Sequence, residues 1–280
     1  MVEVVYVCSP EYWRHLFLSL RTLYASGTHF DRVRVLVTAP TPPHWDIRSD
    51  KVVVEPVPDL GHHGFWMMNK AHLCRSEADV VIFLDTDTVV LRPIDAVYAG
   101  SRADLHARTA PVVQTSYFRP AQWEATLRHF GCAPGPYVST GFLVLKNGAQ
   151  KALRAAWVDL MERIRRGEGV EQVTRHADQY AFSIAAYRQG LSLQLMNDAH
   201  HAYAMLGEGH EGATVYHLGT PNFYYYYLQV ERDLDLTPDD APVKRPSFLR
   251  LHRLKNRLAR KVRMKMGIDR KSRGLQRTTS

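Results

Sequence analysis

The sequence predicts an α/β fold: one domain with a mixed, mainly parallel central sheet, followed by a basic helical tail. Strand-like and helical segments alternate over roughly the first hundred residues, as they do in folds built on a parallel sheet. The run Val80–Leu84 is apolar at every position, which is typical of a strand buried on both faces at the centre of such a sheet. With 280 residues, the chain can bury one sizeable core. We expect the domain to span residues 1–242 and the tail residues 243–280.

The individual elements follow from the spacing of apolar residues. The first strand is predicted over Val2–Val7, a short run rich in β-branched residues. A helical pattern, in which leucines recur among polar residues, begins after Ser9 and Pro10. Later strands are expected over Val33–Val37, Val52–Val57, Tyr137–Leu145 and Thr214–Leu218, and helices over Phe65–Ser76, Gln150–Arg166 and Asp178–Arg188.

Positive charge is concentrated at one end of the chain. The net charge is +8, but residues 243–280 hold 14 of the 36 Lys and Arg residues and a single acid, Asp269. The tail therefore carries +13, and the remainder, with 22 basic and 27 acidic residues, carries −5. A mildly acidic body argues against nucleic acid as a partner.

The tail has the pattern of a basic amphipathic helix. Phe248, Leu251, Leu254 and Leu258 recur at spacings of three and four, with Arg and Lys on the other faces. Such a helix is suited to an anionic membrane surface. The alternatives are a final helix packed on the core and a nucleic-acid contact. The segment after Gly267 has the composition of a disordered end.

The composition also indicates a compartment. No apolar run approaches the roughly 20 residues that a membrane-spanning helix needs, and the N-terminus lacks the charged region and cleavage site of a secretory signal. Cys8, Cys74 and Cys132 show no metal-site spacing and are expected to be reduced thiols. We therefore expect a cytoplasmic protein that associates peripherally with the inner face of the membrane through its tail.

Two carboxylates, Asp85 and Asp87, directly follow the apolar run Val80–Leu84. Ligands of open α/β sheets bind at the carboxyl ends of strands, where these acids fall. An extended strand would point both side chains to the same side, where they could hold one hard cation that bridges diphosphate oxygens. An Asp-x-Asp triplet after a strand can also be only a turn or a helix cap.

The segment Val-Ile-Phe-Leu-Asp-Thr-Asp-Thr-Val-Val-Leu resembles the DxD strand of glycosyltransferase family 8, the retaining GT-A enzymes that include glycogenin-like and bacterial lipooligosaccharide galactosyltransferases. Three later segments resemble further motifs of that family, in the family's order, and the resemblance covers roughly residues 2–222. These segments are Ser139-Thr140-Gly141, Asp178-Gln179 and His217-Leu218-Gly219.

The resemblance implies a GT-A fold and a set of site residues. The metal, Mn²⁺ or Mg²⁺, would be held by Asp85, Asp87 and His217, and imidazole suits Mn²⁺ at least as well. Asp178 and Gln179 would face the donor sugar and the reaction centre as catalytic residues. The nucleotide-sugar donor, a UDP-sugar, would be bound by Cys8, Tyr12, Lys70, Asp85, Thr86, Ser139, Gly141 and Gly219. The implied reaction is a retaining transfer of a hexose to a hydroxyl of a carbohydrate or glycolipid acceptor.

Two departures from the family pattern are visible. Family members commonly follow the histidine motif with a lysine that grips the diphosphate, whereas Thr220 follows Gly219 here. Ser139 stands where the family usually has an asparagine, which has a longer reach for hydrogen bonds. The departures motivate a rival hypothesis, in which the chain is a catalytically inactive GT-A domain that binds a nucleotide sugar. A second rival is a membrane-tethered interaction protein whose functional part is the tail.

Single residues also have a second interpretation. His217 lies between apolar residues and could be a core histidine, and Lys70 could be a solvated helix residue. Tyr12 could pack on the core, and Asp178 could only cap a helix. Four consecutive tyrosines at 224–227 cannot all face one way, so we expect most of them to pack rather than to line an acceptor site.

Overall fold

The computed structural model describes residues 1–39, 49–61, 66–110, 120–170, 177–219 and 223–233. The predicted basic helix of the tail and Thr220 lie outside these ranges. The division into a domain of residues 1–242 and a tail therefore stays a prediction.

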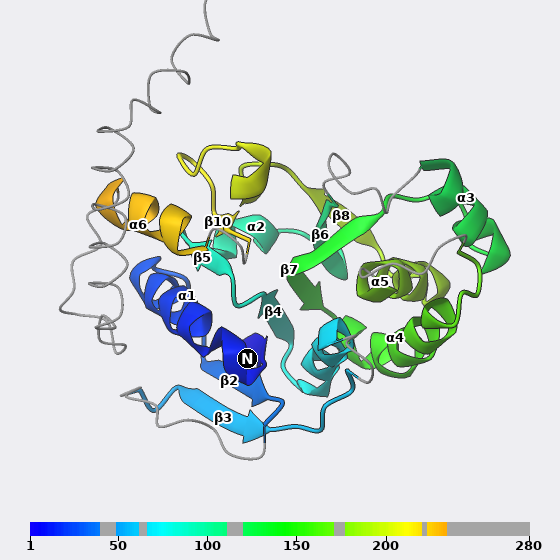
Figure 1. Ribbon diagram of the computed structural model, residues 1–280, viewed down its shortest axis with the longest axis horizontal. Coiled ribbons are helices and arrows are strands. Elements are labelled where there is room, and N and C mark those ends of the chain that lie inside the picture. Colours follow the sequence, from blue (N-terminus) through cyan, green and yellow to red (C-terminus); the bar gives the residue numbers. More distant parts are fainter. Residues whose placement is uncertain (40–48, 62–65, 111–119, 171–176, 220–222, 234–280) are drawn as a thin grey trace, which may run out of the picture.

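The centre of the molecule is a mixed sheet, in which the described residues form seven strands (Figure 1). In order across the sheet, its strands are β3 (Val52–Pro56), β2 (Arg32–Val37), β1 (Val2–Cys8), β4 (Val80–Leu84), β7 (Val138–Lys146), β6 (Leu105–Thr109) and β8 (Leu193–Met196). The strands β3, β2, β1 and β4 run parallel, β7 is antiparallel to both of its neighbours, and β8 is parallel to β6. This confirms the predicted α/β fold with a mixed, mainly parallel sheet and β4 in its middle.

A smaller sheet begins just after β4, the middle strand of the large sheet. It consists of β5 (Thr88–Val90), β10 (Val215–His217) and β9 (His201–Tyr203). The central strand β10 is antiparallel to β5 and parallel to β9. Because β5 begins three residues after Asp85, this sheet brings the late strand β10 to the end of β4.

Helices cover both faces of the large sheet (Figure 1). The α-helices are α1 (Trp13–Ala25), α2 (Asp95–Tyr98), α3 (Pro120–His129), α4 (Ala149–Arg165), α5 (Ala177–Arg188) and α6 (Phe223–Asp233). The short 3₁₀ segments are η1 (Pro10–Tyr12), η3 (Trp66–Arg75) and η4 (Ala204–Leu206). The tyrosine run lies in α6, where Tyr227 is fully buried and Tyr225 is 54% exposed, so these tyrosines face different ways as expected.

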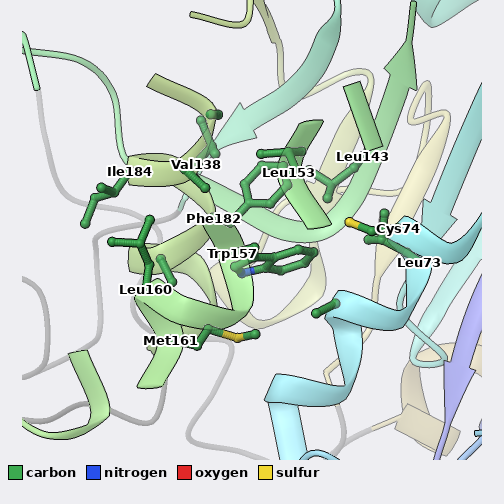
Figure 2. Packing of buried hydrophobic residues seen from close by; sticks show 14 of the residues in the cluster. Leu73, Cys74, Val138, Leu143, Leu153, Trp157, Leu160, Met161, Phe182 and Ile184 are labelled. Atoms are coloured by element: carbon green, nitrogen blue, oxygen red, sulfur yellow. The ribbon is translucent and has the colours of Figure 1, made fainter. Parts of the chain in front are cut away.

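Side-chain alternation along the strands makes two cores. In β1, Val4 and Tyr6 pack with leucines of α1, whereas Val5 packs with η3, α4 and α5 on the other face. The second core is centred on Trp157 of α4, which is fully buried and lies 4.9 Å from Phe182 between ring centroids (Figure 2). The face that carries η3, α4 and α5 also carries several residues of the candidate site.

The segment predicted as a helix over 65–76 forms the 3₁₀ helix η3 instead of an α-helix. With three residues per turn, positions i and i+3 share an edge, and Asn69 and His72 both bind the preceding loop along one edge. Asn69 Oδ1 accepts from the Leu60 amide at 2.7 Å, and His72 Nε2 lies 2.8 Å from the Pro58 carbonyl oxygen. These contacts fix the orientation of η3, and thereby of Lys70.

Across the described ranges, none of the helices combines the length and the apolar character that crossing a membrane requires.

Candidate active site

A cavity of about 380 Å³ opens where β1 and β4 end and the antiparallel strand β7 begins. Its walls come from several parts of the chain that are far apart in sequence. They include Ser9 and Tyr12 after β1, Met67 and Lys70 of η3, Asp85 to Asp87 after β4, Tyr137 just before β7, Ser139 to Gly141 of β7, Asp178 and Gln179 of α5, and Tyr203 and His217 of the small sheet. This is the edge at which open α/β sheets bind their ligands.

The two acids lie in a tight turn, which differs from the extended geometry expected from the sequence. The strand β4 ends at Leu84, and the Asp85 carbonyl accepts from both the amide and the hydroxyl of Thr88, at 3.2 and 2.7 Å. The turn that joins β4 to β5, rather than strand alternation, directs Asp85 and Asp87 into the same cavity. The Thr86 side chain between them is buried and also lines the cavity.

His217 is brought to the acids by strand pairing. In the antiparallel pair of β10 and β5, His217 stands opposite Thr88, and the Leu218 amide donates to the Asp87 carbonyl at 2.9 Å. Nε2 of His217 then lies 3.1 Å from Oδ1 of Asp87. One ligand atom from each of Asp85, Asp87 and His217 falls within 4.8 Å of the others. Two distant parts of the sequence thus form one cluster.

Gly141 makes room for this cluster. A Cβ atom placed on Gly141 would lie 2.6 Å from Cε1 and 2.7 Å from Nδ1 of His217, and 3.3 Å from Oδ2 of Asp85. The first two distances are closer than real carbon contacts allow. The glycine therefore permits close approach of the histidine ring, a reason for the glycine beyond the donor binding that the resemblance implies.

The donor set of the cluster fits a divalent cation. Two carboxylates and one imidazole are ligands of Mn²⁺, and the carboxylates also suit Mg²⁺. Burial raises the pKa of Asp85, with Asp87 adding to the effect and Lys70 opposing it. Burial would also raise the pKa of Asp87, but His217 and Lys70 outweigh it and hold that pKa below its usual range. Burial alone would lower the pKa of His217, and the two carboxylates raise it above the usual value.

Lys70 lies between two carboxylates and is not a solvated helix residue. Its Nζ donates to Oδ2 of Asp85 at 2.8 Å and lies 3.6 Å from Oδ2 of Asp178. It also donates to Oγ1 of Thr140 at 3.3 Å. Burial would lower the pKa of Lys70, but Asp85 and Asp178 outweigh it and raise the pKa, so the side chain stays cationic.

Asp178 lies in the first turn of α5, but its carboxylate binds a residue of β7 instead of capping the helix. Oδ2 accepts from the Thr140 hydroxyl at 2.7 Å. The other oxygen, Oδ1, is buried and has no hydrogen-bond partner in the part of the chain that the structure describes. The backbone of Asp178 is held by Trp157, whose Nε1 donates to its carbonyl at 2.9 Å. Gln179 follows and lines the same cavity.

The structure brings most of the sequence-predicted donor residues into the cavity, but not all. Tyr12 and Ser139 line it. Cys8 does not: its side chain is fully buried, its Sγ donates to the Ser9 carbonyl at 3.3 Å, and burial raises the pKa of the thiol. Gly219 also lies off the cavity wall, in a left-handed conformation (φ +71°) that favours glycine. Its conformation gives a structural reason for this glycine.

Sequence reasoning missed a group of residues around His217. Nε2 of His201, a residue for which we expected no role, lies 3.4 Å from Nδ1 of His217. The Tyr203 ring stacks on His217 with centroids 4.9 Å apart, and its hydroxyl donates to Oγ of Ser139 at 2.5 Å. The guanidinium group of Arg108 lies over the Tyr203 ring, with its Cζ atom 5.1 Å from the ring centroid. The only signal in the sequence is the spacing His-x-Tyr, which puts both side chains on one face of a strand.

No family model matches the sequence, and no curated protein matches it either. Several solved structures do share its fold. The galactosyltransferase LgtC, solved in complex with donor and acceptor sugar analogs, is 14% identical with a TM-score of 0.59, over 85% of this chain and 98% of LgtC. The glycosyltransferase GlyE of Streptococcus pneumoniae TIGR4 is 15% identical with a TM-score of 0.54, over 88% of this chain and 66% of GlyE. The bifunctional glycosyltransferase WbbM is 14% identical with a TM-score of 0.56, over 85% of this chain and 50% of WbbM. At these identities the likeness establishes the fold alone: this chain has the GT-A fold of these glycosyltransferases.

Proposed function

We propose that this protein is a metal-dependent glycosyltransferase, which moves a hexose from a nucleotide-diphosphate sugar, with UDP as the nucleotide, to a hydroxyl acceptor with retention of configuration. The observation that carries the proposal is the meeting of three features in one cavity: the ligand cluster of Asp85, Asp87 and His217, the partly buried cation of Lys70, and the carboxylate of Asp178. The shared fold with structures of glycosyltransferases supports it.

The first requirement of the reaction is to stabilise the departing nucleotide diphosphate. A Mn²⁺ or Mg²⁺ ion bound by Asp85, Asp87 and His217 would neutralise the negative charge that grows on its phosphates. Lys70 is placed to help, because its Nζ is held at the same cluster by Asp85. A fixed cation in a partly buried site needs no reorganisation when charge develops. We propose that Lys70 supplies the phosphate contact for which the family commonly uses a lysine after the histidine motif.

The second requirement is to stabilise positive charge near the anomeric carbon and to orient the sugar. Asp178 and Gln179 line the cavity on the α5 side, and Tyr12 lines the same cavity after β1. The Asp178 carboxylate keeps one buried oxygen unpartnered among the described residues, which leaves it available to a sugar hydroxyl. One LgtC structure carries a glutamine-to-glutamate substitution in its active site, so a glutamine belongs to that protein's site. We propose the same for Gln179.

The nucleotide and sugar contacts are assigned by position. Tyr12, at the end of η1, lines the cavity and offers an aromatic face to a uracil ring. Ser139 lines it as well, but its Oγ accepts from the Tyr203 hydroxyl and from the Gly141 amide at 3.2 Å. This oxygen is therefore better suited to holding Tyr203 than to gripping a sugar. The acceptor, a carbohydrate or a membrane glycolipid, is proposed from the resemblance and from the basic tail.

A donor-hydrolysis screen tests the proposal without knowledge of the acceptor, because water replaces the acceptor hydroxyl. The purified full chain is incubated with Mn²⁺ and a panel of UDP-, GDP- and other nucleotide sugars, and release of the nucleotide is measured. We expect turnover with at least one UDP-sugar, its loss on chelation, and its loss in Asp87→Asn. The matched control is Asp159→Asn, which changes an exposed acid in a surface ion pair with Arg163.

Two other outcomes would contradict the proposal in different ways. Binding of UDP by calorimetry without turnover of any donor would indicate an inactive GT-A domain. Turnover that survives both chelation and Asp87→Asn would show that the carboxylate cluster is not a metal site for catalysis. A function that is lost on removal of residues 243–280 but kept in Asp87→Ala would favour the tethered interaction protein.

A further inference from the structure

The two ring nitrogens of His217 contact different residues. Nε2 lies 3.1 Å from Oδ1 of Asp87, so this nitrogen faces the carboxylates of the candidate metal site. Nδ1 lies 3.4 Å from Nε2 of His201. The second contact is partly buried, and its His201 side is 0% exposed. The pair of histidines is therefore a hydrogen-bonded unit of which one member reaches the cluster.

A histidine that binds a cation through Nε2 must carry its proton on Nδ1. Inside a protein that N–H group needs an acceptor, and metal-bound histidines usually donate to a carboxylate or a backbone carbonyl. Within the described ranges, the hydrogen-bond partner of Nδ1 is Nε2 of His201. A second imidazole thus occupies the place that a carboxylate or carbonyl takes in other sites. A neutral imidazole accepts with one nitrogen only, so the proton of His201 must then sit on its own Nδ1.

We propose that His201 is a positioning residue of the metal site: its Nε2 accepts the hydrogen bond from Nδ1 of His217 and so leaves Nε2 of His217 unprotonated toward the cation. The inference rests on the proposed function, because the tautomer of His217 matters for catalysis only if His217 is a ligand. Nδ1 of His201 is buried and has no hydrogen-bond partner among the residues described. The tautomer of His201 is therefore set by His217 and by no competing contact in that part of the chain.

Strand register explains why these residues meet. The strand β9 runs parallel to β10, with Tyr203 registered against His217 and His201 against Val215. Residues two apart share a face of a strand, so His201 and Tyr203 both lie on the side of the His217 ring. The Tyr203 ring covers the flat face of His217 at an interplanar angle of 19°, and His201 approaches its Nδ1 edge. The ring is thus held from its face and from its edge.

Arg108 of β6 holds the backbone of β9 in place. Its Nη1 donates to the His201 carbonyl at 2.6 Å, and its two terminal nitrogens donate to the two carboxylate oxygens of Glu208 at 2.8 Å each. Oε2 of Glu208 accepts in turn from the Tyr203 amide at 2.6 Å. A paired arginine and carboxylate fix direction as well as distance. The backbone on both sides of Ala202 is therefore tied to β6, which keeps His201 in register with His217.

The test compares two substitutions of the same residue in the full chain. His201→Gln keeps a side-chain acceptor near the position of Nε2, whereas His201→Leu removes it and keeps the bulk. Mn²⁺ affinity is measured by electron paramagnetic resonance of the free ion, with thermal unfolding as the folding control. We expect His201→Leu to weaken Mn²⁺ binding by about 10–100-fold, as loss of an outer hydrogen-bond partner typically does. His201→Gln should recover most of that loss at a similar unfolding temperature.

Equal Mn²⁺ affinity in the parent and in a folded His201→Leu variant would overturn the proposal, and so would an equal loss in both variants. If His201→Leu does not fold, the proposal is tested on the unchanged protein instead. The tautomers of its histidines are determined from long-range ¹H–¹⁵N spectra, with Mg²⁺ in place of paramagnetic Mn²⁺. We expect the proton of His201 on Nδ1, and a proton on its Nε2 would overturn the proposal. Asp87→Ala distinguishes failure of the proposed metal site from failure of the proposed role of His201. If Mn²⁺ binding survives this substitution, the assignment of the metal site is wrong, whatever the role of His201.

Discussion

The Nζ atom of Lys70 lies 2.8 Å from Oδ2 of Asp85 and joins the candidate metal cluster to the carboxylate of Asp178, which is 3.6 Å away on its other side. The lysine reaches this place because η3 is tied to the loop before it through Asn69 and His72. A cation so placed shares Asp85 with any metal ion bound there. The positive charge of Lys70 should therefore favour catalysis and oppose metal binding.

Lys70→Met should lower kcat of donor hydrolysis by about 10²–10³-fold, the loss seen when one preorganised group that stabilises developing charge is removed. The same substitution should leave Mn²⁺ affinity unchanged or make it higher, because a positive charge next to Asp85 is removed. Both are measured on the purified chain, by nucleotide release and by Mn²⁺ titration. Lys151→Met, which changes a lysine in an exposed ion pair with Glu77, is the matched control. A Lys70→Met variant with parental kcat would refute the assignment.

Gly141→Ala should weaken Mn²⁺ binding by about 10-fold or more, because the new methyl group would press on the His217 ring at 2.6 Å and displace a ligand. The fold should survive, since one local contact is changed. Gly209→Ala is the control: its added Cβ would meet its nearest atom only at 4.0 Å, and its backbone is not in the left-handed region. Calorimetric titration of both variants with Mn²⁺ measures the difference. Unchanged affinity in Gly141→Ala would mean that His217 does not have to lie where the structure places it.

The parts of the fold that the sequence predicted are those with long runs of apolar residues. Strands such as β1 and β4 are runs of five to seven mostly apolar residues, and a run of that length is readable without tertiary context. The strands β5 and β9 have three residues each and were not predicted, because three residues show no period. They form only through pairing with β10, which is a contact between distant parts of the chain.

The site shows the same division. The resemblance to a family pointed to Asp85, Asp87 and His217, and the structure gathers them into one cluster. It could not show that Gly141 faces the histidine ring, because which atoms a glycine admits depends on packing between β7 and β10. The resemblance also could not show that His201 contacts the ring of His217. That contact depends on the register between β10 and β9, a strand that was not predicted from the sequence.

Asp178→Asn should lower kcat of donor hydrolysis about 100-fold and change KM for the donor little. The substitution keeps the size of the side chain and removes the negative charge that would stabilise positive charge at the anomeric carbon. Thr140→Val removes the hydroxyl that donates to Oδ2 of Asp178 and keeps the charge, so it should cost about 1 kcal/mol of stability and much less of kcat. Steady-state kinetics of both variants separate charge from positioning. An equal fall of kcat in the two variants would show that the orientation of Asp178, rather than its charge, is what matters.

The stability of the protein should fall as the pH is lowered from 6.5, and His106 should account for part of the fall. His106 of β6 is 1% exposed, and burial, followed by the nearby Lys146 and His200, lowers its pKa to about 4. Above pH 6.5 the side chain is neutral in both the folded and the unfolded state, so its titration contributes nothing. Between pH 6.5 and about 4 the unfolded chain takes up a proton that the folded chain does not.

His106→Leu should therefore reduce the loss of unfolding free energy between pH 7.5 and pH 5 by about 1–2 kcal/mol, from 1.36 kcal/mol per unit of pKa difference. Urea unfolding at the two pH values, followed by fluorescence, gives the difference for each variant and cancels any change in packing that does not depend on pH. His29→Leu, which replaces an exposed histidine, is the control for the removal of a histidine from the surface. The other buried histidines with lowered pKa values, His15, His72 and His201 among them, contribute to the slope in the same direction in the parent and in the variant. The same loss in the parent and in His106→Leu would show that His106 takes up a proton in the folded state as readily as in the unfolded chain.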